Sequence, residues 1–194
     1  MLFGEFLYPV AISRDTMRAK IQTFLDNHKV PAPVNSEFCG TVNGIQYWCR
    51  YFNINPGLIL ATMILEQPAL FGIGNGKITD WTHNACLGVV GQDAPGTSRT
   101  DLLGVAQQIY RCPRSYAWSF NATPGHIFGE DSMQPTWPRY KLGRVMQLLD
   151  TPGQTHVPLN AQEYALLMYC PHLGRLESMQ EIWDQYILND FNLL

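Results

Sequence analysis

The chain has 194 residues, of which 46% are hydrophobic and 15% are charged, and its formal net charge is −3. This length and composition suit one globular domain with a sizeable core and argue against a disordered chain. The 13 Lys and Arg residues form no basic run, and no apolar run reaches transmembrane length, so neither a nucleic-acid protein nor a membrane span is expected.

Helical periodicity runs through the first part of the chain. Residues 13–28 are predicted to form a helix capped by Ser13 or Asp15, with an apolar stripe made by Met17, Ile21, Phe24 and Leu25. Residues 42–52 also have apolar side chains at helical spacing. A third helix is predicted over 55–66, with Asn55 as N-cap and Pro56 at the first helical position.

Four further helices are predicted in the second part, over residues 100–111, 138–149, 160–169 and 175–187. The third of these opens with Asn160 and Glu163, which is close to a capping box. Strand signals are weak, and Gly- and Pro-rich connectors separate the helices. We therefore expect a mainly α protein, a single domain over 1–194 with long loops and at most a small β element. Long loops in a compact domain usually carry function.

Metal, cofactor and nucleophile motifs are missing from the sequence. Five cysteines, Cys39, Cys49, Cys86, Cys112 and Cys170, form no CxxC pair, and buried thiols or one or two disulfides stay equally open. The histidines His83, His126 and His172 are possible polar contacts but lack metal-ligand spacing. The glycines of GIGNGK, residues 72–77, follow a helix and not a strand, so they are interpreted as a return loop rather than a phosphate site. We expect no metal and no cofactor, and no GxSxG motif indicates a serine hydrolase.

The stretch INPGLILATMILEQP, residues 54–68, ends an apolar helix with a single carboxylate, Glu66. Apolar surroundings and the negative end of the helix dipole both disfavour a charge there, so the pKa of Glu66 is expected to be raised. A carboxyl group that keeps its proton is what a general acid requires. The alternative is a glutamate that lies in solvent or pairs with Arg50 or Lys77.

This helix resembles that of the lysozyme-like superfamily of glucosaminidases and lytic transglycosylases, which share the pattern NP-x-L-x-L-A-x-x-x-x-E. The matching residues are Asn55, Pro56, Leu58, Leu60, Ala61 and Glu66. The segment NACLGVVGQ is similar to the one that follows the active-site helix and lines the sugar groove, where Asn84 and Gly88 would correspond. The resemblance is loose over residues 13–120 and tight over 53–66. Gln67 and Pro68 depart from it, since the family commonly has Ser, Thr or Gly after the acid.

The resemblance implies a glycoside hydrolase or lytic transglycosylase that cleaves β-1,4 bonds of peptidoglycan with Glu66 as the general acid. Its partners would be peptidoglycan glycan strands, and its location periplasmic, secreted or at the cell wall. The N-terminal stretch MLFGEFLYPVAISRD has no basic region before its apolar residues, so it is not predicted to be a signal peptide. Which bond is cut, and whether by hydrolysis or transglycosylation, stays open, as does the oligomeric state.

A second catalytic carboxylate is common in glycosidases, although the family's transglycosylases use groups of the substrate instead. The candidates are Asp80, Asp93, Asp101, Glu130 and Asp131. Asp101 is discounted because it fits the first turn of a helix. Asp93, just after the groove segment, and Glu130, in a polar loop, are kept as catalytic candidates.

Sugar grooves present aromatic faces to the C–H face of a pyranose ring. The predicted substrate-binding residues are Asn84, Gly88, Tyr110, Tyr116 and Trp118. Tyr116 and Trp118, placed in or beside a loop, are the preferred platform, whereas Trp48 and Trp183 are assigned to the core. Two other hypotheses stay open: a non-catalytic glycan-binding protein on the same fold, and a protein-interaction module.

Overall fold

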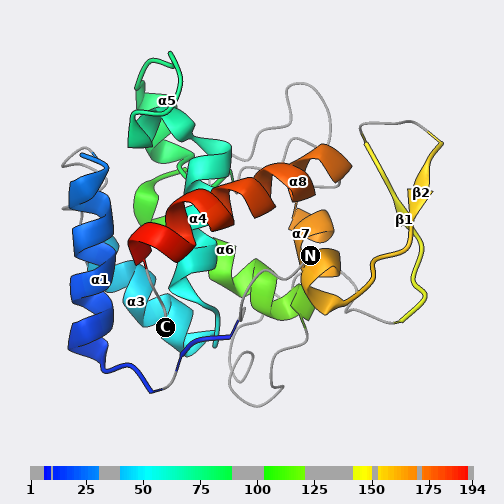
Figure 1. Ribbon diagram of the computed structural model, residues 1–194, viewed down its shortest axis with the longest axis horizontal. Coiled ribbons are helices and arrows are strands. Elements are labelled where there is room, and N and C mark those ends of the chain that lie inside the picture. The colour runs from blue at the N-terminus through cyan, green and yellow to red at the C-terminus, as the bar shows by residue number, and fades with distance from the viewer. Residues whose placement is uncertain are drawn as a thin grey trace.

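The computed structural model describes residues 7–9, 11–30, 40–88, 103–120, 142–149, 153–169 and 172–191, without the side chains of residues 118, 120, 189 and 190. These residues form a mainly helical body with a two-stranded hairpin at one side (Figure 1). The prediction of a mainly α fold with a small β element is confirmed. None of the described helices is long and apolar enough to cross a membrane.

The order of elements follows the chain from α1 to η3. The helices are α1 Arg14–Asn27, α3 Thr41–Tyr51, α4 Pro56–Glu66, the short 3₁₀ turn η1 Pro68–Phe71, α5 Asp80–Asn84, α6 Val105–Phe120, α7 Ala161–Tyr169, α8 Leu173–Ile182 and its π-helical continuation η3 Trp183–Phe191. Strands β1, Met146–Gln147, and β2, Thr155–His156, pair antiparallel with Met146 opposite His156.

Helix α4 lies in the middle of the body (Figure 1) and is buried along nearly its whole length, from Pro56 to Ile64. It packs against α3, α6, α8 and η3. Its predicted cap is confirmed, because the Asn55 side chain accepts a hydrogen bond from the Gly57 amide at 2.8 Å. Burial on all sides explains why this helix has almost no polar residue.

Helices α1, α7 and α8 with η3 also confirm their sequence patterns. Helix α1 buries its predicted stripe, and Ser13 caps it by accepting from the Thr16 amide. At the start of α7, the Glu163 amide donates to Asn160 at 2.9 Å, and Glu163 accepts from the Leu159 amide at 2.7 Å. The other carboxylate oxygen of Glu163 lies 2.6 Å from His156 Nε2, so this residue also joins β2 to α7.

The helix predicted over 100–111 is wrong in its bounds, because α6 runs from Val105 to Phe120. Pro113 lies inside it, where a proline removes one backbone donor and normally ends a helix. The helix continues because the residues on both sides of Pro113 are buried in the core, among them Cys112, Tyr116 and Ala117. The segment 114–120 is therefore helical and not part of a loop.

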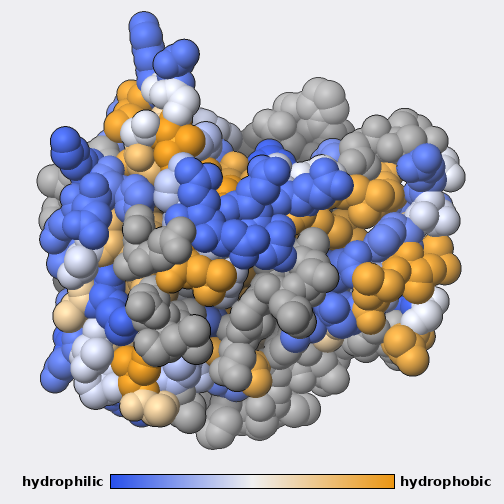
Figure 2. Space-filling model, viewed as in Figure 1, coloured by the Kyte–Doolittle hydropathy of each residue, from blue (hydrophilic) through white to orange (hydrophobic). Residues whose placement is uncertain are grey.

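The helix predicted over 138–149 is also wrong for its described part, residues 142–149, which contain β1 and no helix. Gly143 has a left-handed φ of +76°. Leu142, Val145 and Leu149 are 86%, 58% and 64% exposed, and only Met146 of the expected apolar stripe is buried. Figure 2 shows hydrophobic side chains gathered over this hairpin at the edge of the molecule.

Helices α3 and α6 approach closely at Gly44. A Cβ atom built at Gly44 would lie 2.2 Å from Cδ1 of Ile109, well inside van der Waals contact. Gly44→Val should therefore lower the free energy of unfolding by about 1–3 kcal/mol, as overpacking does. Arg50→Val, at an exposed position of the same helix, should change it by no more than about 0.5 kcal/mol. Urea unfolding measures both, and equal stabilities would contradict this packing.

Candidate functional site

Glu66 is the last residue of α4, as predicted, and its side chain is partly buried. Burial raises the pKa of Glu66 above its ordinary value, while the charges of Arg175 and His172 lower it in part. Both basic residues belong to the start of α8, where His172 is the N-cap. The net effect is a carboxyl group that keeps its proton to higher pH than a solvent-exposed glutamate does.

The backbone of Gly88 lies directly against the Glu66 carboxyl group. A Cβ atom at Gly88 would be 2.7 Å from Oε2 of Glu66 and 2.8 Å from both Cδ and Cγ. Gly88 also has a left-handed φ of +69°, which glycine adopts without strain. The structure therefore brings together two of the residues that the resemblance singled out, and it explains why position 88 holds a glycine.

The segment 85–88, which carries Gly88, is held by three side chains, one from α6, one from α7 and one from the residue after α4. The Leu87 amide donates to Gln108 of α6 at 3.2 Å, and the Leu87 carbonyl accepts a hydrogen bond from the hydroxyl of Tyr169 at the end of α7. Gln67, just after α4, donates from Nε2 to the Ala85 carbonyl at 3.3 Å. These bonds fix the position of the backbone segment that lies against Glu66.

Tyr169, which is partly buried, belongs to a stack of aromatic and polar groups beside Glu66. Its ring lies 4.8 Å from that of Tyr116 at an angle of 14°. The Tyr116 hydroxyl lies 2.9 Å from Oγ1 of Thr62 on α4, and Thr62 in turn donates to a backbone carbonyl of its own helix. Burial first, and then the nearby Cys112, Tyr116 and Glu66, raise the pKa of Tyr169 well above its usual range. The phenol is therefore neutral near pH 7.

Cys112 of α6 shares a hydrogen bond with Tyr169. Burial raises the pKa of the Cys112 thiol, that hydrogen bond lowers it in part, and Cys86 and Glu66 raise it further. Cys49, Cys86 and Cys112 are all buried, and none of them forms a disulfide. Raised pKa values leave the thiols of Cys49 and Cys112 protonated and poorly nucleophilic, so these two act here as small packing groups.

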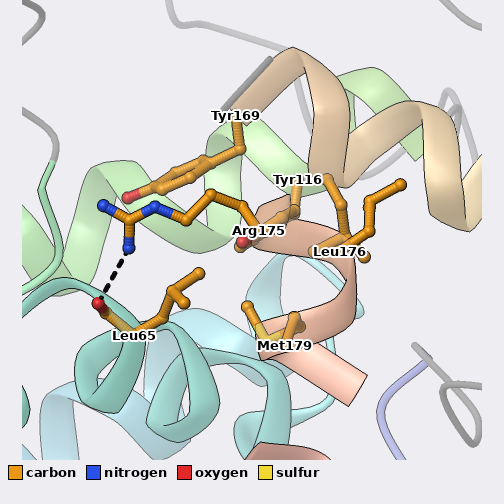
Figure 3. A pocket seen from close by; sticks show the side chains of 7 residues that line it. Leu65, Tyr116, Tyr169, Arg175, Leu176 and Met179 are labelled. Carbon is orange, nitrogen blue, oxygen red and sulfur yellow. Dashed lines mark hydrogen bonds between the residues drawn. The ribbon is translucent and has the colours of Figure 1, made fainter. Parts of the chain in front are cut away.

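Arg175 joins the start of α8 to the end of α4. Its Nη1 donates to the Leu65 carbonyl at 3.0 Å, which satisfies one of the carbonyls left free at the end of α4 (Figure 3). A cavity of about 10 Å³, room for one water molecule, lies here. It is lined by Leu65, Tyr116, Leu166, Tyr169, Arg175, Leu176 and Met179. This cavity is too small for a sugar ring, so it supports the site and does not bind substrate.

Some of the predicted site residues fall outside the part of the chain that the structure describes, and others belong to α5. The acids Asp93, Asp101, Glu130 and Asp131 fall outside the described residues, and so does the side chain of Trp118. Asp80 is exposed in the first turn of α5. The Asn84 carbonyl accepts from the Gly104 amide at 2.8 Å, which links α5 to the residues before α6.

The structure corrects the predictions made for Tyr116 and Tyr110. Tyr116 is only 1% exposed, because its ring is covered by Tyr169 inside the helical body, so it offers no face to a sugar. Tyr110 packs against Trp48 and Phe52 of α3, with ring centroids 4.7 and 5.9 Å away. It therefore belongs to the contact between α3 and α6 and not to the groups around Glu66.

Sequence reasoning missed Tyr169 and Arg175. Tyr169 ends its helix and Pro171 follows two residues later, the same order as Glu66 and Pro68. That repeated arrangement was the available signal, because a proline two residues on stops a helix and leaves a polar side chain at its end. Arg175 had no comparable signal, since its contact with Leu65 spans 110 residues.

No group of three His, Cys, Asp or Glu side chains in the described part of the chain could hold a metal ion. Comparison with models of known protein families, with curated proteins and with solved structures gives no match for this chain. What the site can do must therefore be argued from its geometry and chemistry.

The fit of Gly88 against Glu66 can be measured with a matched pair of glycines. Gly72 has a nearly identical φ of +66°, but a Cβ there would meet nothing within 4 Å. Gly72→Ala should therefore lower the free energy of unfolding only by the backbone strain, about 1–2 kcal/mol. Gly88→Ala should lower it by about 1–3 kcal/mol more, because the whole Glu66 side chain must move. Equal losses in urea unfolding would show that Glu66 does not lie against residue 88.

Proposed function

We propose that this chain is a lysozyme-like glycosidase that cleaves β-1,4 bonds of peptidoglycan, with Glu66 as its general acid. The observation that carries the proposal is a single carboxyl group at the end of the buried helix α4, with a raised pKa and a glycine backbone against it. Glycosidic bond cleavage needs a proton donor for the leaving oxygen while positive charge builds on the sugar ring. The raised pKa of Glu66 favours the protonated carboxyl group that can supply this proton.

Gly88 supports this role because it carries no side chain over the carboxyl group. A Cβ at residue 88 would lie 2.7 Å from Oε2 and 2.8 Å from Cδ and Cγ of Glu66, so the acid has its present position only because residue 88 is glycine. A general acid must lie within hydrogen-bond distance of the oxygen that takes its proton, so its position matters for catalysis. Any larger residue at 88 would push the acid away from this position.

Tyr169 and Arg175 act as positioning groups in this proposal. Tyr169 holds the Leu87 carbonyl and therefore the backbone next to Gly88. Arg175 holds the last turn of α4 at Leu65, and its charge limits how far the pKa of Glu66 rises. A general acid works best when its pKa lies near the working pH, so opposing effects of burial and positive charge suit this role.

A second candidate is a glycan-binding protein that cuts nothing. Gln67 and Pro68 replace the small residues that follow the acid in the resembled family, and this departure favours the candidate. In the structure Gln67 contributes a hydrogen bond to the Ala85 carbonyl, which helps to hold the segment over Glu66. Turnover separates the two candidates, because only the enzyme releases products.

The catalytic proposal is tested by Glu66→Gln. Removal of a general acid should lower activity by about 10²–10⁴-fold, because glutamine cannot donate the proton. Activity is measured as turbidity loss of purified cell-wall sacculi, with products identified by mass spectrometry. Glu177→Gln, at an exposed position of α8, should keep full activity and is the matched control.

Equal activity of wild type and Glu66→Gln, above a blank, would reject Glu66 as the acid. The product ends decide the reaction type among active forms. An anhydro end indicates transglycosylation, whereas a reducing muramic end or a reducing glucosamine end indicates a muramidase or a glucosaminidase.

The raised pKa of Glu66 also predicts a pH dependence of stability. In the unfolded chain the pKa of Glu66 is about 4.3. In the folded protein this pKa is higher. Between these values the folded state binds more protons, so wild-type stability falls as pH rises through that interval. Glutamine does not titrate, so the stability of Glu66→Gln relative to wild type should increase over the same interval.

Thermal unfolding midpoints measured from about pH 4 upward test this expectation. The difference between Glu66→Gln and wild type should grow in favour of the variant and then level off above the folded-state pKa. Glu177→Gln, whose side chain is exposed, should show no such growth. A constant difference for Glu66→Gln at every pH would contradict a raised pKa.

A further inference from the structure

The outer face of α3 carries two exposed aromatic rings. Tyr47 is 56% exposed and Tyr51 is 47% exposed, while the opposite face of α3 is buried at Val42, Ile45 and Cys49. Large aromatic side chains are usually covered in a folded protein, so a pair of them on one exposed helix face is an unusual surface. Neither residue has a role in the proposed catalytic site.

These two rings are held in place by their neighbours. They lie nearly parallel, with centroids 6.3 Å apart and an angle of 16°. Trp48 meets each of them edge-on, at 4.8 Å from Tyr47 and 5.7 Å from Tyr51. Trp48 itself packs edge-on against Tyr110 of α6 at 4.7 Å. The rings are therefore ordered before any ligand arrives, which reduces the entropy lost on binding.

The polar groups around the rings fit a neutral, hydroxyl-rich ligand. The other exposed residues of α3 are Asn43 and Arg50, and α3 contains no acidic residue. Aromatic faces bind the C–H face of a pyranose ring, while amide and guanidinium groups donate hydrogen bonds to hydroxyl and acetyl oxygens. Single-stranded nucleic acid also stacks on aromatic rings, but it requires a basic groove, and the chain has a net charge of −3.

We propose that Tyr47 and Tyr51, supported by Trp48 and Tyr110, form a second glycan-binding surface, which contacts a strand of N-acetylated amino sugars. This surface consists of α3 residues and Tyr110 of α6. The groups around Glu66 come from other positions, on α8, at Tyr169 of α7, at Cys112 of α6 and in segment 85–88. Its ligand class rests on the proposed function. A surface of this kind keeps the protein on its polymer between cleavage events, because a released chain end leaves a second contact in place.

Binding is measured in a Glu66→Gln background, so that no ligand is consumed. The probes are insoluble peptidoglycan sacculi in a sedimentation assay and a soluble N-acetylglucosamine tetramer in a calorimetric titration. Tyr47→Ala with Tyr51→Ala should weaken binding to sacculi by about tenfold through the loss of two ring contacts. Tyr47→Phe with Tyr51→Phe keeps both rings and should retain most of the binding.

The matched control is Leu142→Ala with Leu149→Ala, which removes two exposed aliphatic side chains from the hairpin and should leave binding unchanged. Thermal unfolding midpoints equal to that of the parent confirm that each variant is folded. The proposal is overturned if the parent does not bind sacculi, or if the alanine pair binds as the parent does. It is also overturned if the alanine pair abolishes self-association in analytical ultracentrifugation and leaves glycan binding intact.

The two proposals fail in different ways. Full activity of Glu66→Gln would reject the catalytic role of Glu66 and would not touch the binding result for Tyr47 and Tyr51. If Glu66→Gln loses turnover and the alanine pair binds as its parent does, the surface on α3 is rejected and the catalytic proposal stands.

Discussion

The burial of α4 on all sides is the constraint on which the rest of the structure depends. A helix with no solvent face must have its ends satisfied by the protein itself. Asn55 satisfies the amide of Gly57 at the start, and Arg175 satisfies the Leu65 carbonyl at the end. Because the helix stops where the core stops, its final residue, Glu66, is left at the boundary between hydrocarbon and polar groups. The raised pKa of Glu66 is a consequence of that position.

The backbone of Leu87 is hydrogen-bonded to two helices that are remote from it in sequence. Its amide is bonded to α6 through Gln108 and its carbonyl to α7 through Tyr169. The next residue, Gly88, lies against Glu66. The distance between acid and backbone is therefore set by helices that are remote in sequence. A buried polar group that lost its partner here would cost about 1–3 kcal/mol, so the bonds from Gln108 and Tyr169 stabilise this part of the backbone.

Local signals in the sequence were enough for α1 and α4, where caps and apolar spacing agree with the final packing. They failed where tertiary contacts override them. The helix predicted over 100–111 was too short, so Tyr116 was placed in or beside a loop, whereas buried residues on both sides of Pro113 carry α6 to Phe120. The resemblance to a family placed Gly88 in a segment that lines the groove, but it did not predict the contact between Gly88 and Glu66. The end of a helix before Pro171 could have drawn attention to Tyr169, but its partner could not be predicted, because Leu87 lies 82 residues away and no periodic pattern encodes such a contact.

The double attachment of α7 has a mechanical consequence. Near its first turn, Glu163 bonds both His156 of the hairpin and the Leu159 amide, and at its last residue Tyr169 bonds Leu87. A helix of this length is roughly 13 Å long. Because α7 is bonded at both ends, a displacement of the hairpin is passed along this helix to the backbone at Leu87, next to Gly88 and Glu66.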